Sequence, residues 1–301
     1  MSRFYHALQE ARRTASEGNT FAAEPEKRES GDDGGPVRSY PRVMAAAASA
    51  GESHPTAERM DREIPMADLE TGWFGIPARM VLDESARLIP HAVDATVVEH
   101  YRRLRAKIIQ EQERKPFRSL LVTSPDPEDG KSVTALNLAL SFGMLPSHRV
   151  LVVDGDLRKG SLGKWLGVGD HSGLSNLIGG SAELEDVVLK CDEIPVSFIV
   201  RGSDTTSPAE LLHSSRLIPQ LQKMTEHFSL VIVDSPAVNS VADAQLLAAA
   251  CDAALLVARA FTTTRKTLQK AVQDLSPFRV IGTVLNRGLR NDLYRRYKYY
   301  E

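Results

Sequence analysis

Three short apolar runs in the second half of the chain constrain its fold most strongly. They span residues 120–123, 150–153 and 230–233, and none of them alternates polar with apolar side chains. A strand that is apolar at every position is buried on both faces, which is typical of a parallel sheet covered by helices. Helical patterns separate the runs, so we predict an α/β fold with a doubly wound, mostly parallel sheet and right-handed crossovers.

The remaining elements are predicted from spacing, glycine stops and the position of proline. Pro208 is expected in the first helical position after a cap near Ser207. The expected strands cover residues 196–200, 253–259 and 279–286, and the expected helices cover 94–112, 207–224, 241–251 and 264–275, with short helices in 161–167, 173–180 and 182–190.

Gly130, Lys131 and Ser132 stand between the first apolar run and a helical pattern rich in Ala and Leu. A strand, a turn and a helix in this order are the context of a phosphate-binding loop. Backbone N–H groups of the turn would face the phosphates, Lys131 would reach the β- and γ-phosphates, and the Ser132 hydroxyl would ligate Mg²⁺. Position 125, where the GxxxxGK[ST] pattern has its first glycine, is proline, so the pattern is incomplete.

Carboxylates follow the other two apolar runs. Asp154 and Asp156 come directly after the second run, and Asp234 follows the third. The carboxyl ends of parallel strands meet at the edge where open α/β sheets bind ligands. Buried carboxylates are costly there unless they hold a cation or transfer a proton, so we predict that all three are functional. Asp234 has the position of the carboxylate that orders the Mg²⁺ shell in phosphate-loop proteins.

Composition indicates which kinds of partner and which cellular compartment fit the chain. The chain of 301 residues is 42% hydrophobic and 25% charged, with a net charge of −2, so nucleic acid is not indicated as the main partner. Its two cysteines do not suggest a disulfide framework and fit a reducing compartment. No run of apolar residues approaches the length of a membrane span, and the N-terminus does not read as a signal peptide. A cytoplasmic protein is expected.

The chain is predicted to have three parts. Residues 1–90 have a composition that offers little apolar surface to bury, so a largely disordered extension is expected. Residues 91–288 form the folded domain, and residues 289–301 form a flexible tail. Four of the seven tyrosines lie in this tail, at positions Tyr294, Tyr297, Tyr299 and Tyr300. An aromatic and basic nucleic-acid arm or a docking strand are alternatives, but tyrosines beside a nucleotide site suggest phosphate acceptors.

The helix expected over residues 94–112 is amphipathic. Its apolar positions keep a helical spacing, while Glu99, Arg102 and Arg105 lie three residues apart and form a charged ridge. One interpretation is a solvated helix face with a Glu99–Arg103 pair.

Together these motifs resemble those of the bacterial tyrosine kinases of exopolysaccharide and capsule synthesis. The resemblance covers roughly residues 94–301. It is carried by the GKS loop, by VVDGDLR and VIVDSP as the second and third phosphate-loop elements, by EHYRRLR as an ExxRxxR helix, and by the tyrosine-rich tail. SPAELL and VIGTVLN are smaller similarities.

The resemblance implies a role for each matched residue. Asp154 would accept the proton of the attacking tyrosine, with Lys131 and Arg158 assisting, and Asn286 would read the adenine edge. Glu99, Arg102 and Arg105 would form the interface of a ring of subunits. The phosphates of ATP would be bound by Gly130, Lys131, Ser132 and Val133, and Mg²⁺ by Ser132, Asp156 and Asp234.

The implied activity is that of a cytoplasmic ATP-dependent protein-tyrosine autokinase, which phosphorylates its tail between subunits and regulates polymer export. The implied partner is the cytoplasmic tail of a membrane activator protein, which would recruit the chain to the membrane. A non-kinase ATPase switch and a scaffold without nucleotide are the alternatives. Three departures bear on them: Glu128 and Asp129 make the loop acidic, DSPA replaces the usual DTPP, and Asp126 stands where the partitioning ATPases carry a signature lysine.

Overall fold

A computed structural model describes residues 75–78, 80, 88, 95–168, 170–191, 194–203 and 205–288. The chain divides into two compact units, Met1–Met66 and Ala67–Glu301, and every described residue belongs to the second. Most of the expected N-terminal extension and the whole expected tail therefore lie outside the described residues. Within the described ranges, no helix is long and apolar enough to cross a membrane.

The described residues form one eight-stranded sheet with the order β1-β4-β5-β3-β6-β2-β7-β8. All neighbouring pairs are parallel except β4 and β5. The predicted mostly parallel sheet is therefore confirmed. The strands are β1 (Ile76–Pro77), β2 (Ser119–Thr123), β3 (Val150–Asp154), β4 (Leu189–Cys191), β5 (Ile194–Ile199), β6 (Leu230–Asp234), β7 (Ala253–Arg259) and β8 (Val280–Asn286).

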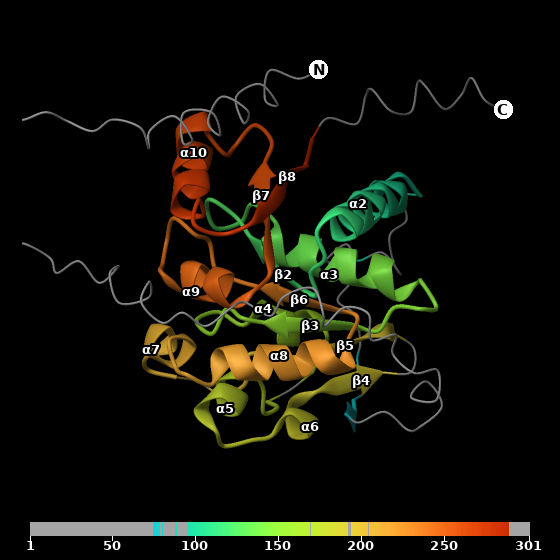
Figure 1. The fold of residues 1–301 in the computed structure, drawn as a ribbon, viewed down its shortest axis with the longest axis vertical. Coiled ribbons are helices and arrows are strands. Elements are labelled where there is room, and N and C mark those ends of the chain that lie inside the picture. The colour runs from blue at the N-terminus through green and yellow to red at the C-terminus, as the bar shows by residue number, and fades with distance from the viewer. Residues whose placement is uncertain are drawn as a thin grey trace, which may run out of the picture. The chain divides into compact units, whose positions relative to one another are not determined.

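Helices connect most of these strands. They are α2 (Ala95–Arg114), α3 (Lys131–Gly143), α4 (Ser161–Trp165), α5 (Leu174–Gly179), α6 (Leu184–Val187), α7 (Pro208–Leu212), α8 (Leu217–His227), α9 (Asp243–Ala250) and α10 (Arg265–Asp274). Figure 1 shows β7, β8 and α10 at one end of the sheet, and β4, α5 and α6 at the other. The strands β3, β6 and β2 lie at the centre, between these two ends.

The central strands are buried at every position, as their unbroken apolar runs predict. Leu120 and Val122 of β2 pack in one apolar cluster with Leu136 of α3 and Ile108 of α2. Leu121 lies between them, is fully buried and does not belong to that cluster. Successive side chains of a strand point to opposite faces, so both faces of the sheet are covered.

One predicted helix is divided in two. The helix expected over residues 207–224 is observed as α7 and α8, separated by residues 213–216, so the prediction of one helix is wrong. The backbone N–H of Ser214 donates to the Leu211 carbonyl at 3.2 Å, and Leu217 donates to the Ser214 carbonyl at 3.3 Å, which forms a turn.

The edge of the sheet beyond β5 contains two strands that the sequence analysis did not predict. The segment expected as a helix over residues 182–190 is helical only to Val187, and β4 follows it, antiparallel to β5. Next to β4, Ile76 and Pro77 form β1, and Met80 and Leu88 are buried. Part of the segment expected as an extension therefore packs on this unit.

Candidate active site

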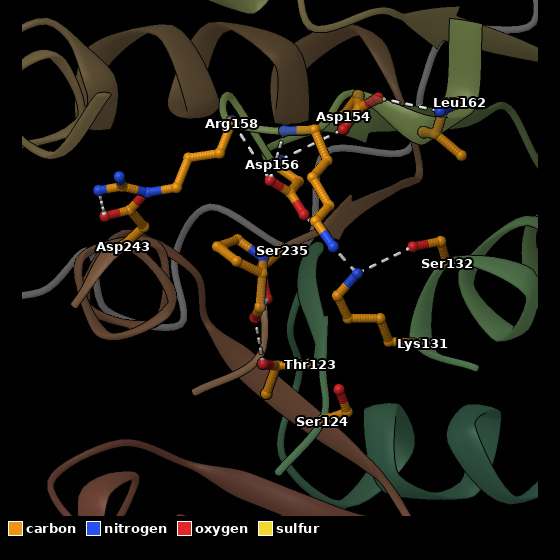
Figure 2. Close-up of polar contacts among 12 residues, drawn as sticks. Thr123, Ser124, Lys131, Ser132, Asp154, Asp156, Arg158, Leu162, Ser235 and Asp243 are labelled. Carbon is orange, nitrogen blue, oxygen red and sulfur yellow. Dashed lines mark hydrogen bonds and ion pairs between the residues drawn. The ribbon is translucent and has the colours of Figure 1, made fainter. Parts of the chain in front are cut away.

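The candidate site lies where three neighbouring strands end. β3, β6 and β2 are adjacent in the sheet, and Asp154 of β3 is in register with Asp234 of β6. β2 leads into the loop that precedes α3, the helix that starts at Lys131. The sheet therefore brings together the predicted lysine and the three predicted carboxylates. Figure 2 shows Lys131 with two of them, Asp154 and Asp156.

The phosphate loop ends at Gly130, the residue that caps α3. Its φ of 95° lies in the left-handed region, which favours glycine because no Cβ is present. Immediately after it, the Lys131 ammonium lies 3.1 Å from the Ser132 hydroxyl and 3.8 Å from the Asp156 carboxylate. The N-terminus of α3, one ammonium and one hydroxyl thus occur together, which is a set suited to an anionic phosphate chain.

Asp154 is a fully buried carboxyl group at the end of β3. Its oxygens accept hydrogen bonds from the backbone N–H groups of Leu162 at 3.0 Å and Asp156 at 3.2 Å. Burial and the nearby Asp234 charge nevertheless raise the pKa of Asp154 to about 8. The group is therefore mostly protonated at neutral pH unless positive charge enters the site.

Asp234 is also fully buried, and no donor lies within ordinary hydrogen-bond distance and angle of either carboxylate oxygen, although the Ser132 hydroxyl and the Ser235 backbone N–H are nearby. Burial raises the pKa of Asp234 to about 6, although the nearby Lys131 charge and Ser132 hydroxyl act in the opposite direction. A buried carboxylate without hydrogen bonds is rare in folded proteins, because burial removes the water that would otherwise bind it. Two free oxygens beside a lysine are suited to a cation held together with phosphates.

Asp156 completes the acidic group. Its Oδ1 accepts hydrogen bonds from the backbone N–H groups of Arg158 at 3.3 Å and Lys159 at 3.0 Å, which leaves Oδ2 on the side of Lys131. Asp156, Asp234 and Ser132 are the predicted Mg²⁺ ligands, and all three are hard oxygen donors. Mg²⁺ usually takes one or two carboxylates together with substrate phosphates, and this donor set fits that habit.

Arg158 lies at the rim of the site with a partner of its own. Its guanidinium donates to both oxygens of Asp243, at 2.8 and 3.1 Å, and Asp243 is fully buried at the start of α9. Bidentate pairing fixes the plane of the guanidinium. The sequence analysis did not single out Asp243, because an aspartate that opens a helix is usually a capping residue.

The acidic loop residues lie in different surroundings. Glu128 is exposed and has a φ of 66°, in the left-handed region that favours glycine. Asp129 is buried, and its carboxylate accepts a hydrogen bond from Thr263 at 2.9 Å. Asn286, expected at the adenine edge, donates its side-chain amide to the Asp129 carbonyl at 2.9 Å.

The charged ridge of α2 is paired within the subunit. Glu99 lies 3.3 Å from Arg103 and 3.8 Å from Arg102, so the pair expected for a solvated helix is present. Arg105 donates to the backbone carbonyl of Ser141, near the end of α3. Arg102 keeps an exposed side chain, so an interface with a neighbour stays a prediction. The four predicted tail acceptors lie outside the described residues.

The fold and the arrangement of the site define the class of phosphate-loop NTPases. Comparisons with known proteins narrow this class. The chain is 32% identical over 171 residues to the tyrosine-protein kinase CpsD of Streptococcus pneumoniae, covering 55% of this chain and 74% of that protein. It is 28% identical over 195 residues to the putative tyrosine-protein kinase CapB of Staphylococcus aureus, covering 64% and 85%.

A solved structure also resembles the chain and is likewise that of a bacterial tyrosine kinase. The kinase domain of the Escherichia coli tyrosine kinase ETK superposes with a TM-score of 0.65 and 27% identity, over 76% of this chain and 88% of that domain. No model of a known protein family matches the chain. The chain belongs to the family of bacterial tyrosine-protein kinases.

Proposed function

We propose that this protein is an ATP-dependent protein-tyrosine autokinase that phosphorylates its own C-terminal tyrosines between subunits. The observation that carries the proposal is the convergence of Lys131 with Asp154, Asp156 and Asp234 at the ends of neighbouring strands. Phosphoryl transfer needs mainly positioning and charge stabilisation, and these groups supply both.

The chain's own residues would hold the nucleotide from two directions. The N-terminus of α3, with Gly130 and Val133, would face the phosphates, and the Lys131 ammonium would neutralise the transferring group. Mg²⁺, held by Ser132, Asp156 and Asp234, would supply positive charge to the phosphate oxygens. Arg158, oriented by Asp243, would add a second positive group at the rim.

Asp154 would accept the proton of the attacking tyrosine hydroxyl on one of its carboxylate oxygens. A raised pKa makes the ionised group a stronger base, but it also reduces the ionised fraction at neutral pH. The backbone donors at Leu162 and Asp156 hold the carboxyl group in place while its proton is exchanged. The pKa of about 8 thus lies close enough to neutrality for reversible proton transfer.

The acceptors would be Tyr294, Tyr297, Tyr299 and Tyr300. At up to roughly 3.3 Å per residue, residues 289–301 extend some tens of Å, far enough for a neighbouring site. A ring of subunits would form through α2, with Glu99, Arg102 and Arg105 at the contact. Each phosphate adds about −1.5 to −2 charge, so phosphorylated tails would be repelled from the carboxylates and the ring would open.

The same resemblance supports a setting at the cell membrane. We propose that the cytoplasmic tail of a membrane activator protein recruits and stimulates the kinase, and that the phosphorylation cycle regulates exopolysaccharide polymerisation and export.

A non-kinase ATPase switch is the competing function. It would use the same phosphate site without any transfer to tyrosine.

The test incubates the full chain with γ-labelled ATP and Mg²⁺, with and without the activator's tail peptide, and maps the label by mass spectrometry. The proposal expects label on the tail tyrosines and none in Lys131→Met. ATP hydrolysis without labelled tyrosine would instead establish the ATPase switch. Label at Tyr5, Tyr40 or Tyr101 would contradict the assigned acceptors.

A further inference from the structure

The phosphate loop contains a buried carboxylate that the chemistry above does not use. Asp129 directly precedes Gly130 and is 2% exposed. Its Oδ1 accepts the Thr263 hydroxyl at 2.9 Å, and its Oδ2 accepts the backbone N–H of Asp126 at 3.2 Å. One oxygen therefore fixes the turn of the loop, and the other ties the loop to the segment after β7.

Thr263 is itself held in place by the end of β7. Its hydroxyl oxygen accepts the backbone N–H of Arg259 at 2.8 Å, and its own N–H donates to the Arg259 carbonyl at 2.9 Å. The hydroxyl has one proton, which it donates to Asp129. Because the end of β7 donates to the Thr263 hydroxyl oxygen, Thr263 is the donor and Asp129 the acceptor of the bond between them.

A second contact joins the loop to the end of β8. The Asn286 amide donates to the Asp129 carbonyl at 2.9 Å, while its Oδ1 accepts the backbone N–H of Arg287 at 2.8 Å. The same side chain lies directly against the loop, because a Cβ added at Gly130 would be 2.0 Å from the Asn286 amide nitrogen. Any larger residue at 130 would collide with it.

The ends of β7 and β8 are also joined to each other, since Ala260 donates to the Asn286 carbonyl at 2.8 Å. Together these contacts hold the Asp129 end of the phosphate loop against the ends of β7 and β8. Such a support matters here because position 125 is proline and Glu128 occupies the left-handed region at a φ of 66°. A loop held ready for its ligand loses less entropy when the ligand binds.

We propose that Asp129 is a positioning residue for the nucleotide, holding the phosphate loop against the ends of β7 and β8 through Thr263 and Asn286. This inference rests on the proposed function, because it states how the same phosphate site is kept in shape. It gives Asn286 a role that experiment can separate from reading the adenine edge.

The test measures the Kd for Mg-ADP by calorimetry, and the KM for Mg-ATP, in Asp129→Asn, Thr263→Val and the double variant. Each single variant should weaken Mg-ADP roughly tenfold, as expected for a hydrogen bond to a charged group. The double variant should weaken Mg-ADP by clearly less than the product of the two single effects, since both changes act on the bond between Asp129 and Thr263. The value of kcat at saturating ATP should change less than KM.

Matched controls separate positioning from general damage. Thr262→Val removes a neighbouring exposed hydroxyl and should bind Mg-ADP like the wild type. Thr263→Ser keeps the hydroxyl and should restore most of the affinity lost in Thr263→Val. If Asp129→Asn does not fold, the comparison of Thr263→Val with Thr263→Ser carries the test.

Asn286→Ala distinguishes the two roles of the amide. Loop positioning predicts that Mg-ADP and Mg-GDP weaken by the same factor, whereas weakening of Mg-ADP alone would overturn the role given to Asn286. If the wild type does not bind Mg-ADP, the proposed function fails and the inference falls with it. If the wild type binds, and the variants lower the Tm without changing Kd, Asp129 is only structural and the inference alone is wrong.

Discussion

Two aspartates at opposite ends of nearby strands have contrasting surroundings, because Asp252 precedes the first residue of β7 and Asp234 is the last residue of β6. Asp252, just before β7, is exposed, yet its carboxylate accepts three hydrogen bonds, from the backbone N–H groups of Arg118 and Ser119 at 2.9 Å and from the Ser119 hydroxyl at 2.8 Å. Asp234, at the end of β6, is fully buried and accepts none. Water could donate hydrogen bonds to the exposed Asp252 carboxylate, whereas water does not reach the buried Asp234 carboxylate. The protein therefore supplies donors to the carboxylate that depends on them less.

We interpret this difference as that between a structural carboxylate and one that would bind a ligand. Asp252 joins the start of β7 to the start of β2, and its three bonds stabilise the register of these strands. The bare carboxylate of Asp234 carries a cost in stability that a fold alone gives no reason to keep. The predictions below use this contrast.

The largest effect is expected at the site itself. Lys131→Met and Asp154→Asn should each reduce tail phosphorylation by at least about 10²-fold, as is typical for the loss of a charge-stabilising group or a general base. Both variants should keep a folded domain by circular dichroism. Phosphotyrosine that persisted in both would show that the site has been misassigned.

Neutralising the two compared aspartates should change stability in opposite directions. Asp252→Asn should lower the Tm, because losing bonds to a charged acceptor costs about 1–3 kcal/mol. Asp234→Asn should raise the Tm of the protein without nucleotide, since it removes a buried carboxylate whose ionisation is unfavourable in the folded state, as its raised pKa of about 6 indicates. Each 1 kcal/mol corresponds to about 2–4 °C for a domain of this size. A lower Tm in Asp234→Asn would remove the contrast.

The raised pKa of Asp154 should be detectable in the pH dependence of the protein's stability. Its pKa is about 3.8 when unfolded and about 8 when folded, so between these values only the folded state binds the proton. Unfolding then takes place with proton release, and stability falls as the pH rises through this window. Thermal scans from pH 6 to 9 should show a steeper loss of Tm in the wild type than in Asp154→Asn. Parallel curves would contradict the raised pKa.

The smallest effect on the stability of a subunit is expected on the surface of α2. Arg102 has an exposed side chain and only a 3.8 Å pair with Glu99, so Arg102→Glu should change stability by less than about 0.5 kcal/mol. Arg105→Glu should cost more, because it removes the bond to the Ser141 carbonyl. If the ring exists, light scattering should show that Arg102→Glu abolishes it, whereas unchanged mass would restore the solvated-helix interpretation.

The fold was largely predictable because its signals are local. The unbroken apolar runs require strands buried on both faces, and the parallel arrangement then places Asp154 and Asp234 at one edge. The split between α7 and α8 was missed because the helical pattern of apolar residues continues across the serines at 214 and 215. A short antiparallel strand such as β4 likewise leaves no periodic pattern.

The supporting contacts of the site could not be predicted from the sequence. Asp129 and Thr263 are 134 residues apart, and Arg158 and Asp243 are 85 apart. Such pairs form only when the tertiary fold brings distant segments to the same edge of the sheet. The types of the individual residues do not indicate which segments will meet there. The acidic loop illustrates this: Asp129 could be read only as a charge near the phosphates, whereas its carboxylate is bonded to Thr263.

The most direct test of the central claim compares the thermal shift given by Mg-ADP in the wild type, Asp234→Asn and Asp252→Asn. A ligand at 100 times its Kd stabilises the protein by about 2.7 kcal/mol, which is readily measured as a higher Tm. The account predicts a similar rise in the wild type and in Asp252→Asn, and little or none in Asp234→Asn. An equal rise in all three proteins would contradict the claim that Asp234 is kept bare for the metal and its nucleotide.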